Sequence, residues 1–183
     1  GPIDVSENNR YEELICPVGY YCMNGEKYEC PGGRYGDVEG LSNSECSGLC
    51  SSGYYCPPAS TNSTSIDCGG IDKYCPEGSS NPIDVEDGYY SGPIDVSENN
   101  RYEELICPVG YYCMNGEKYE CPGGRYGDVE GLSNSECSGL CSSGYYCPPA
   151  STNSTSIDCG GIDKYCPEAV SYTHLRAHET SAH

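Results

Sequence analysis

Residues 16–22 read Cys-Pro-Val-Gly-Tyr-Tyr-Cys, and residues 50–56 repeat the pattern as Cys-Ser-Ser-Gly-Tyr-Tyr-Cys. A third version without cysteine, Gly-Tyr-Tyr-Ser, stands at residues 88–91. The cysteines around these stretches are dense and even in number: Cys16, Cys22, Cys30, Cys46, Cys50, Cys56, Cys68 and Cys75. Such a set in a short unit is typical of the disulfide framework of an extracellular protein. We therefore expect covalent bonds between cysteines to hold this unit together.

The unit occurs twice. Gly1–Glu77 recurs letter for letter as Gly92–Glu168, which adds the cysteines Cys107, Cys113, Cys121, Cys137, Cys141, Cys147, Cys159 and Cys166. We take residues 1–91 as copy 1 and residues 92–168 as a truncated copy 2. Within copy 1 the spacing suggests modules over about 16–46 and 50–75, followed by an acidic, proline-containing connector over 78–105. The chain is thus expected to be part of a tandem array.

Composition argues against an ordinary apolar core. The 183 residues include 16 Cys, 24 Gly, 13 Pro and 19 Tyr, but neither Phe nor Trp. Cysteine at this density marks a disulfide scaffold. The expected fold class is small and disulfide-rich, with elongated tandem modules of short β-hairpins and loops and little helix, since no segment shows a sustained 3.6-residue apolar period. Asn24-Gly25 between two β-prone segments predicts one such hairpin.

Charge and hydropathy limit the partners. The net charge is −19, and no basic patch interrupts the acidic composition, so binding to a phosphate backbone is disfavoured on electrostatic grounds and we expect no nucleic-acid partner. No window reaches the ~18 apolar residues of a membrane span. Because the sequence opens inside a repeat, without Met or signal peptide, we expect a fragment that meets a membrane only through segments outside it.

The last residues differ from the repeat. Copy 2 follows copy 1 up to Glu168, after which residues 169–183 contain no cysteine and all three histidines of the chain. This tail resembles an in-frame translation of the transposase adaptor used in preparing sequencing libraries, and we interpret it as non-native. His174 and His178 are spaced as in a zinc-binding helix, but the Glu that should follow His174 in that motif is absent.

Metal and catalytic chemistry find little support. No Cys-x2-Cys pair exists, and the repeats contain no histidine, so the usual zinc spacings are missing. The acidic clusters at residues 37–40 and 84–88 do not match the ligand spacing of an EF-hand, so we expect no cofactor and at most weak calcium association. Without a histidine base or a glycine-rich phosphate loop, we expect no enzyme activity.

Two further features point to an exposed, modified surface. Asn62-Ser-Thr and Asn153-Ser-Thr match the N-glycosylation acceptor and lie in Ser/Thr-rich loops. The doubled tyrosines 20–21, 54–55 and 89–90 alternate faces on an extended strand, so one ring is expected over the disulfides and the other in solvent. These rings either replace a missing core or serve as cross-links or a recognition surface.

The motifs together resemble a known repeat type. The stretches that carry the likeness are residues 16–22, Cys-Pro-Gly-Gly-Arg-Tyr-Gly at 30–36, Gly-Leu at 40–41 with Cys-Ser-Gly-Leu-Cys at 46–50, and Tyr-Cys-Pro-Glu-Gly at 74–78. They are similar to the ephrin-receptor-like cysteine-rich repeats of large surface proteins, particularly in protists. Residues 30–46 also resemble the long-loop module of tumour-necrosis-factor-receptor-like regions. The likeness covers nearly all of residues 1–168.

The resemblance implies part of the disulfide pattern. Eight cysteines allow 105 pairings, and the sequence alone does not choose among them. The long-loop resemblance pairs Cys30 with Cys46 and Cys121 with Cys137. For the last four cysteines of the repeat, the expectation is an interleaved pattern that joins the first to the third, Cys50 to Cys68, and the second to the fourth, Cys56 to Cys75.

These observations together predict a non-enzymatic, extracellular or cell-surface repeat segment. Its disulfide-linked modules would form a semi-rigid rod that acts as a stalk, an adhesion element or a ligand-binding ectodomain, with protein or glycan partners at a cell surface or matrix. The alternative is a cell-wall or matrix protein cross-linked through its tyrosines.

Overall fold

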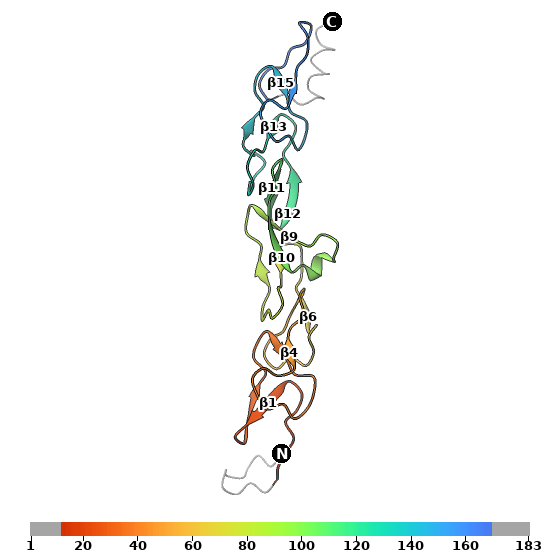
Figure 1. Ribbon diagram of the computed structural model, residues 1–183, viewed down its shortest axis with the longest axis vertical. Coiled ribbons are helices and arrows are strands. Elements are labelled where there is room, and N and C mark those ends of the chain that lie inside the picture. The colour runs from red at the N-terminus through yellow and green to blue at the C-terminus, as the bar shows by residue number, and fades with distance from the viewer. Residues whose placement is uncertain (1–11, 170–183) are drawn as a thin grey trace. The chain divides into compact units, whose positions relative to one another are not determined.

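The computed structural model describes residues 12–169, and every structural statement below concerns these residues. They belong to two units: unit 1 comprises Gly1–Cys68 and Cys75–Pro82, and unit 2 comprises Gly69–Tyr74 and Ile83–His183. Regular structure consists of eight antiparallel sheets of two strands each and one short 3-10 helix (Figure 1). The predicted fold class, a small disulfide-rich chain of β-hairpins with little helix, is confirmed.

The strands are short in both units. Unit 1 contains β1 (Tyr20–Met23), β2 (Glu26–Glu29), β3 (Arg34–Tyr35), β4 (Gly48–Leu49), β5 (Tyr54–Tyr55) and β6 (Ile66–Asp67), paired in sequence order. Unit 2 contains β7 (Lys73–Tyr74), β8 (Ile83–Asp84), β9 (Tyr89–Gly92), η2 (Glu98–Asn100), β10 (Glu103–Ile106), β11 (Tyr111–Met114), β12 (Glu117–Glu120), β13 (Arg125–Tyr126), β14 (Gly139–Leu140), β15 (Tyr145–Tyr146) and β16 (Ile157–Asp158). Its strands also pair consecutively.

The Asn-Gly hairpin is present in both copies. Strands β1 and β2 pair in the register Met23↔Glu26, which leaves Asn24 and Gly25 as a two-residue loop. Both loop residues have positive φ, 53° and 78°, as a type I′ turn requires. The same hairpin recurs in copy 2 as β11–β12.

In the motifs that carry cysteines, a tight turn that ends at the first tyrosine brings the two flanking cysteines together. The Tyr20 N–H donates to the carbonyl of Pro17 at 3.2 Å, and Gly19, third in this turn, has a φ of +81°. Type II turns place a glycine at this position because an L side chain there is strained. The chain reverses between Cys16 and Cys22, whose Cα atoms lie 5.7 Å apart and whose sulfurs are bonded.

All described cysteines are disulfide-bonded, and none is free. The pairs are Cys16–Cys22, Cys30–Cys46, Cys50–Cys56, Cys68–Cys75, Cys107–Cys113, Cys121–Cys137, Cys141–Cys147 and Cys159–Cys166. The long-loop pairs implied by the resemblance are thus present in both copies.

The interleaved pairing expected for the last four cysteines is wrong. Cys50 is bonded to Cys56 and not to Cys68, because the turn that the Tyr54 N–H closes on the Ser51 carbonyl folds the intervening chain back. Cys75 is bonded to Cys68 in the same manner, across a turn closed by the Lys73 N–H. The four cysteines therefore pair consecutively, the first with the second and the third with the fourth.

Successive turns within each unit are joined by one recurring backbone hydrogen bond. The N–H of the turn glycine donates to a carbonyl near the end of the following module at 2.7–2.9 Å. The pairs are Gly19 to Gly36, Gly33 to Cys56 and Gly53 to Cys75 in unit 1, and Gly88 to Cys113, Gly110 to Gly127, Gly124 to Cys147 and Gly144 to Cys166 in unit 2. The backbones of neighbouring modules approach each other closely at these glycines. A Cβ added to Gly33, for example, would lie 2.2 Å from the Gly78 carbonyl oxygen. Each module thus contacts its sequence neighbour through backbone.

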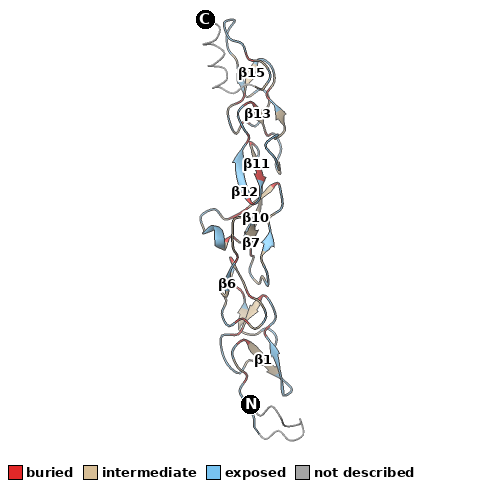
Figure 2. Ribbon diagram, turned by 180° about the vertical axis from the view of Figure 1, so that it is seen from behind, coloured by how far each residue is buried: buried red, intermediate tan, exposed pale blue. Residues whose placement is uncertain are grey.

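Sulfur replaces an apolar core. Every buried hydrophobic residue among those described is a cysteine, while Leu, Ile and Val side chains such as Leu14, Ile83 and Val129 are exposed. Figure 2 shows buried residues only in small patches along the chain, and most strands are intermediate or exposed. Side-chain burial therefore stabilises the modules chiefly through their disulfides.

The expected connector over 78–105 contains regular structure without cysteines. Strand β9 contains Tyr89, Tyr90 and Ser91 of the Gly-Tyr-Tyr-Ser motif and pairs with β10 in the register Leu105↔Tyr90. Ser91 stands where other modules have their second cysteine, is completely buried, and donates its hydroxyl to the Ile71 carbonyl at 2.6 Å. The buried Arg101 guanidinium donates to the Ser91 carbonyl at 2.5 Å. Polar bonds therefore replace a disulfide here.

The substitution Ser91→Ala is expected to lower the free energy of unfolding by about 1–2 kcal/mol, because it removes the hydrogen bond that the buried Ser91 hydroxyl donates to the half-buried Ile71 carbonyl. Exposed Ser44 provides the control, and Ser44→Ala should change stability by no more than about 0.5 kcal/mol. Thermal unfolding of both variants measures the difference. Equal stabilities would show that the buried hydroxyl contributes nothing.

Candidate functional site

The predicted glycosylation loops lie on the surface between paired strands. Asn62 is exposed in the loop that joins β5 to β6, and Asn153 is exposed in the corresponding loop between β15 and β16. The Asn62 Oδ1 accepts hydrogen bonds from the Thr64 backbone N–H at 3.0 Å and from its hydroxyl at 3.4 Å. Asn153 and Thr155 repeat this geometry at 3.0 and 3.3 Å. Both acceptor motifs therefore share one conformation.

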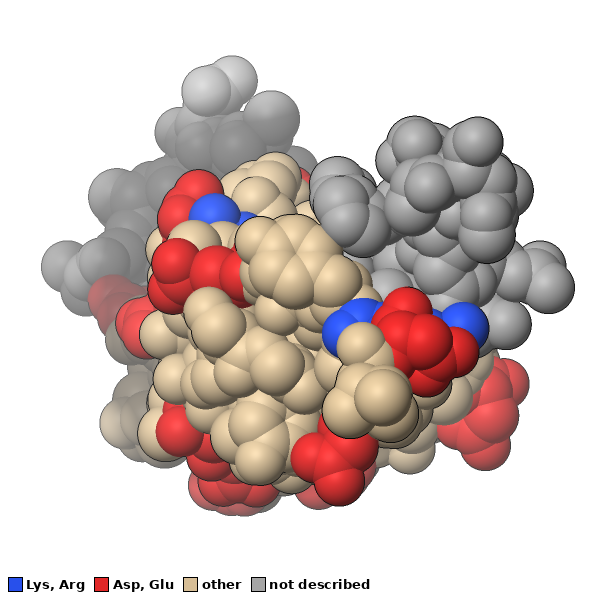
Figure 3. Space-filling model, turned by 90° about the horizontal axis from the view of Figure 1, so that it is seen from above, with Lys and Arg blue, Asp and Glu red and all other residues tan. Residues whose placement is uncertain are grey.

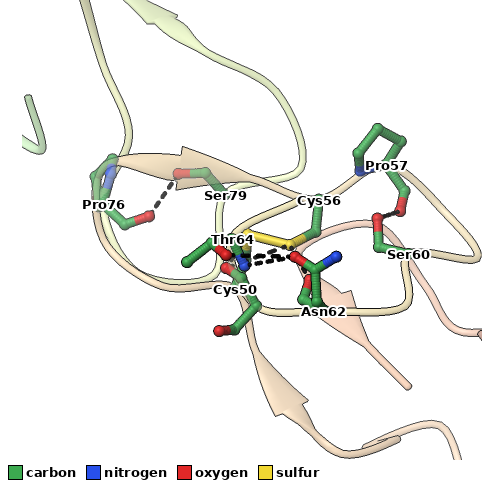
Figure 4. The surroundings of a disulfide bond; sticks show 9 residues. Cys50, Cys56, Pro57, Ser60, Asn62, Thr64, Pro76 and Ser79 are labelled. Atoms are coloured by element: carbon green, nitrogen blue, oxygen red, sulfur yellow. Dashed lines mark hydrogen bonds between the residues drawn. A yellow bond between two sulfur atoms is a disulfide. The ribbon is translucent and has the colours of Figure 1, made fainter. Parts of the chain in front are cut away.

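The loop is held against the Cys50–Cys56 disulfide. Figure 4 shows Asn62 and Thr64 beside this bond. The Ser51 N–H donates to the Ser63 carbonyl at 2.8 Å, and the Asn62 carbonyl oxygen lies 3.6 Å from the Cys56 sulfur. In the same loop, Ser60 donates its hydroxyl to the Pro57 carbonyl at 2.6 Å. The acceptor asparagine thus lies in a loop that a backbone hydrogen bond anchors to the disulfide-closed turn.

A second exposed feature is a pair of stacked tyrosines on each Asn-Gly hairpin. The Tyr21 and Tyr28 rings stack across β1 and β2 with centroids 5.3 Å apart, and Tyr112 and Tyr119 do the same in copy 2. The Tyr28 hydroxyl donates to the Glu26 carboxylate. Sequence reasoning missed Tyr28, although Glu26 and Tyr28 lie two positions apart on a strand, where side chains share a face.

The predicted division of each doubled tyrosine into a covered and a solvent-facing ring is wrong. Tyr20 and Tyr21 are both half-buried, and so are the pairs at 54–55 and 89–90. The cause is cover on both faces of the hairpin: the Lys27 ammonium lies 4.6 Å from the Tyr20 ring centroid, and Tyr28 covers Tyr21. The outward aromatic edge is therefore that of Tyr28, whose side chain is exposed.

The hydrogen bond to Glu26 raises the pKa of Tyr28, because the carboxylate favours the protonated phenol. We expect Glu26→Gln to lower this pKa toward the ordinary value of about 10. Since the folded pKa is the higher one, the contribution to stability is present below the unfolded pKa and is lost as the pH rises through the folded pKa. Phenolate absorbance during alkaline titration measures the shift, and Glu117→Gln should act alike on Tyr119. An unchanged titration curve in both variants would contradict this assignment.

The acidic clusters do not converge on an ion. Within residues 12–169 no group of three or more His, Cys, Asp or Glu side chains is arranged to hold a metal. Asp84 instead accepts a hydrogen bond from the Lys73 ammonium, and the Glu104 carboxylate accepts from the Glu86 N–H at 2.8 Å. His174 and His178 lie outside the described residues.

Fold and surface together define a small disulfide-rich repeat protein built of β-hairpin modules. The described part of the chain contains no helix of the length and apolarity needed to span a bilayer. No family model matches the sequence, and no curated protein is significantly similar to it. The disulfides are the kind of bond that persists in an oxidising environment.

Proposed function

We propose that this chain is a segment of an extracellular protein of the ephrin-receptor-like and tumour-necrosis-factor-receptor-like cysteine-rich type. In this proposal it acts without catalysis as a stalk, adhesion element or ligand-binding ectodomain and meets protein or glycan partners at a cell surface or in a matrix. The observation that carries the proposal is that disulfides replace the apolar core. Such bonds form and persist outside the reducing cytosol.

The surface is consistent with this role. Acidic side chains are scattered over the face shown in Figure 3, with few Lys or Arg among them. With a net charge of −19, an acidic surface of this kind keeps a protein soluble and repels polyanions. The exposed Asn62 and Asn153 add two positions for N-linked glycans, which belong to proteins of the secretory route.

Expression behind a signal peptide in eukaryotic cells tests the proposal. We expect a secreted product with all sixteen cysteines oxidised and a mass that falls on enzymatic removal of N-glycans. Asn62→Gln and Asn153→Gln should each remove one glycan, whereas Asn81→Gln, at an exposed asparagine outside any acceptor motif, should remove none. Retention as a reduced, unmodified cytosolic protein would contradict the extracellular assignment.

A second candidate is a wall or matrix protein that is cross-linked through tyrosine. The exposed Tyr28 and Tyr119 favour it, because each phenol is hydrogen-bonded to a carboxylate that accepts its proton when the ring is oxidised. With a peroxidase and hydrogen peroxide, two tyrosines each lose one electron and one proton as a C–C bond forms between their rings, and one peroxide takes up the two electrons and two protons to give two water molecules. Dityrosine fluorescence that disappears in the double variant Tyr28→Phe and Tyr119→Phe would support this role. Fluorescence that persists would assign cross-linking to other rings or exclude it.

A further inference from the structure

Two identical hairpins have different surroundings in the two copies. Residues 20–29 and 111–120 have the same sequence and the same strand register. Gly116 is buried, and a Cβ placed on it would lie 2.1 Å from the Ile71 carbonyl oxygen. Gly25, its equivalent, is exposed, and a Cβ there would meet no described atom within 4 Å. The end of copy 1 therefore covers the hairpin of copy 2.

Backbone hydrogen bonds hold the end of copy 1 against the hairpin of copy 2. Gly88 donates its N–H to the Cys113 carbonyl at 2.9 Å and accepts the Cys107 N–H at 2.9 Å, while the Ser91 N–H donates to Gly116 at 3.1 Å. The corresponding backbone groups of copy 1 belong to Cys22, Cys16 and Gly25, and they have no such partner among residues 12–169. Cys113 is fully buried, whereas Cys22 is half-buried.

The adjoining strand shows the same contrast. In copy 2, Glu103–Ile106 forms β10 and pairs with β9. The identical residues 12–15 of copy 1 form no strand, and the side chains of Leu14 and Ile15 are 61% and 66% exposed. Leu105 is half-buried and Ile106 is 44% exposed in their paired setting. Among residues 12–169, copy 1 thus presents an unpaired edge beside an uncovered hairpin.

We propose that this face of copy 1, residues 12–16 and 20–29, binds residues 69–92 of a second copy of the repeat. These two stretches are called the first-copy face and the closing segment. The occupant is specified by the structure itself, since the same surface in copy 2 holds this segment in a defined register. The inference goes beyond the proposed function because it states how repeats join, whatever their location.

In this proposal the closing segment of one repeat contacts the first-copy face head to tail and adds a strand to it. The closing segment would pair β9 with residues 12–15 in the register of β10, so that Tyr90 lies opposite Leu14. Lys118 stands 5.1 Å from the Tyr90 ring centroid, and Lys27 is its equivalent in copy 1. Because donor and acceptor surfaces differ, the contact is heterologous. The two faces contribute no free cysteine, so the association is reversible without thiol exchange.

A labelled synthetic peptide of residues 69–92 that carries Cys75→Ser tests the proposal against the intact 183-residue chain. We expect saturable binding of one peptide per chain. Amide exchange at Leu14 and Cys16 should slow on binding, whereas exchange at Leu105 and Cys107 should not, because their partners are already in place. Absence of saturable binding, two peptides per chain, or protection elsewhere would overturn the proposal.

Gly25→Ala provides the decisive variant. A Cβ at this position would collide with the docked Ile71 carbonyl, so affinity should fall at least about tenfold. The matched control is Gly160→Ala, which places the same strained residue (φ +84° against +78°) at a position that is not part of the first-copy face and where an added Cβ meets no described atom within 4 Å. Binding should survive that change. Equal affinity of the two variants would show that the peptide binds somewhere else.

Discussion

Reduction of the disulfides is expected to unfold residues 12–169 completely. The bonded cysteines are 6, 7 or 16 residues apart, and loops of this size contribute about 2–3 kcal/mol each in the chain-entropy account. Eight of them exceed the roughly 5–15 kcal/mol that stabilises an ordinary domain. Since the buried hydrophobic residues are all cysteines, no apolar core remains to support the reduced chain.

Near-ultraviolet circular dichroism of the tyrosines, recorded as reductant is added, measures this loss. Alkylation of the released thiols followed by removal of the reductant keeps the reduced state for comparison. Dispersed amide resonances that persist in the fully alkylated chain would contradict the disulfide-based account of stability. A milder test is the double variant Cys30→Ser and Cys46→Ser, which removes one long-loop disulfide. It should lower the free energy of unfolding by about 3 kcal/mol.

The second large effect concerns Gly25 and Gly116, which occupy the same position in the two copies but should differ in how much a substitution lowers stability. Gly116→Ala should lower stability by about 2–3 kcal/mol more than Gly25→Ala, because the added methyl group meets the Ile71 carbonyl and the Asp72 Cα in one case and open space in the other. The backbone strain is shared, since φ is +79° and +78°, and costs about 1–2 kcal/mol in both variants. Their difference therefore isolates the repeat junction.

Amide exchange of the two hairpins in each variant locates the effect. In Gly116→Ala, protection should fall both around β11–β12 and at Ser91, whose N–H bonds to Gly116. In Gly25→Ala it should fall only near β1–β2. Equal losses in the two variants would mean that residues 71–72 do not press against the second hairpin.

The sequence predicts the disulfide class, the tandem repeat and the Asn-Gly hairpin because each depends on local chemistry. Asn24-Gly25 adopts its turn in both copies without reference to distant residues. The interleaved pairing failed because it followed a family pattern and overlooked the glycine-containing turn between Cys50 and Cys56. That signal was present, since Gly53 stands at the position where a type II turn needs positive φ.

Other features depend on contacts between modules and carry little local signal. Ser91 and Arg101 are polar residues in an acidic stretch, yet both are buried because the chain from Ile71 onward folds back against them. The different exposure of Gly25 and Gly116 could not be predicted from the local sequence, since their flanking sequences are the same. In the candidate glycosylation loop, position and exposure were predictable, but the anchoring to the Cys50–Cys56 bond was not.

The distribution of covalent loops also has a mechanical consequence. Between Cys75 and Cys107 the chain runs for 31 residues without a cross-link, the longest such stretch among the residues described. Pulled along its backbone, this stretch would lengthen first, to a contour of roughly 100 Å, because only hydrogen bonds such as that between Arg101 and Ser91 resist it. The disulfide-closed loops on either side would hold their length. Each junction between repeats would therefore serve as an extensible link that yields under load and re-forms when the tension is released.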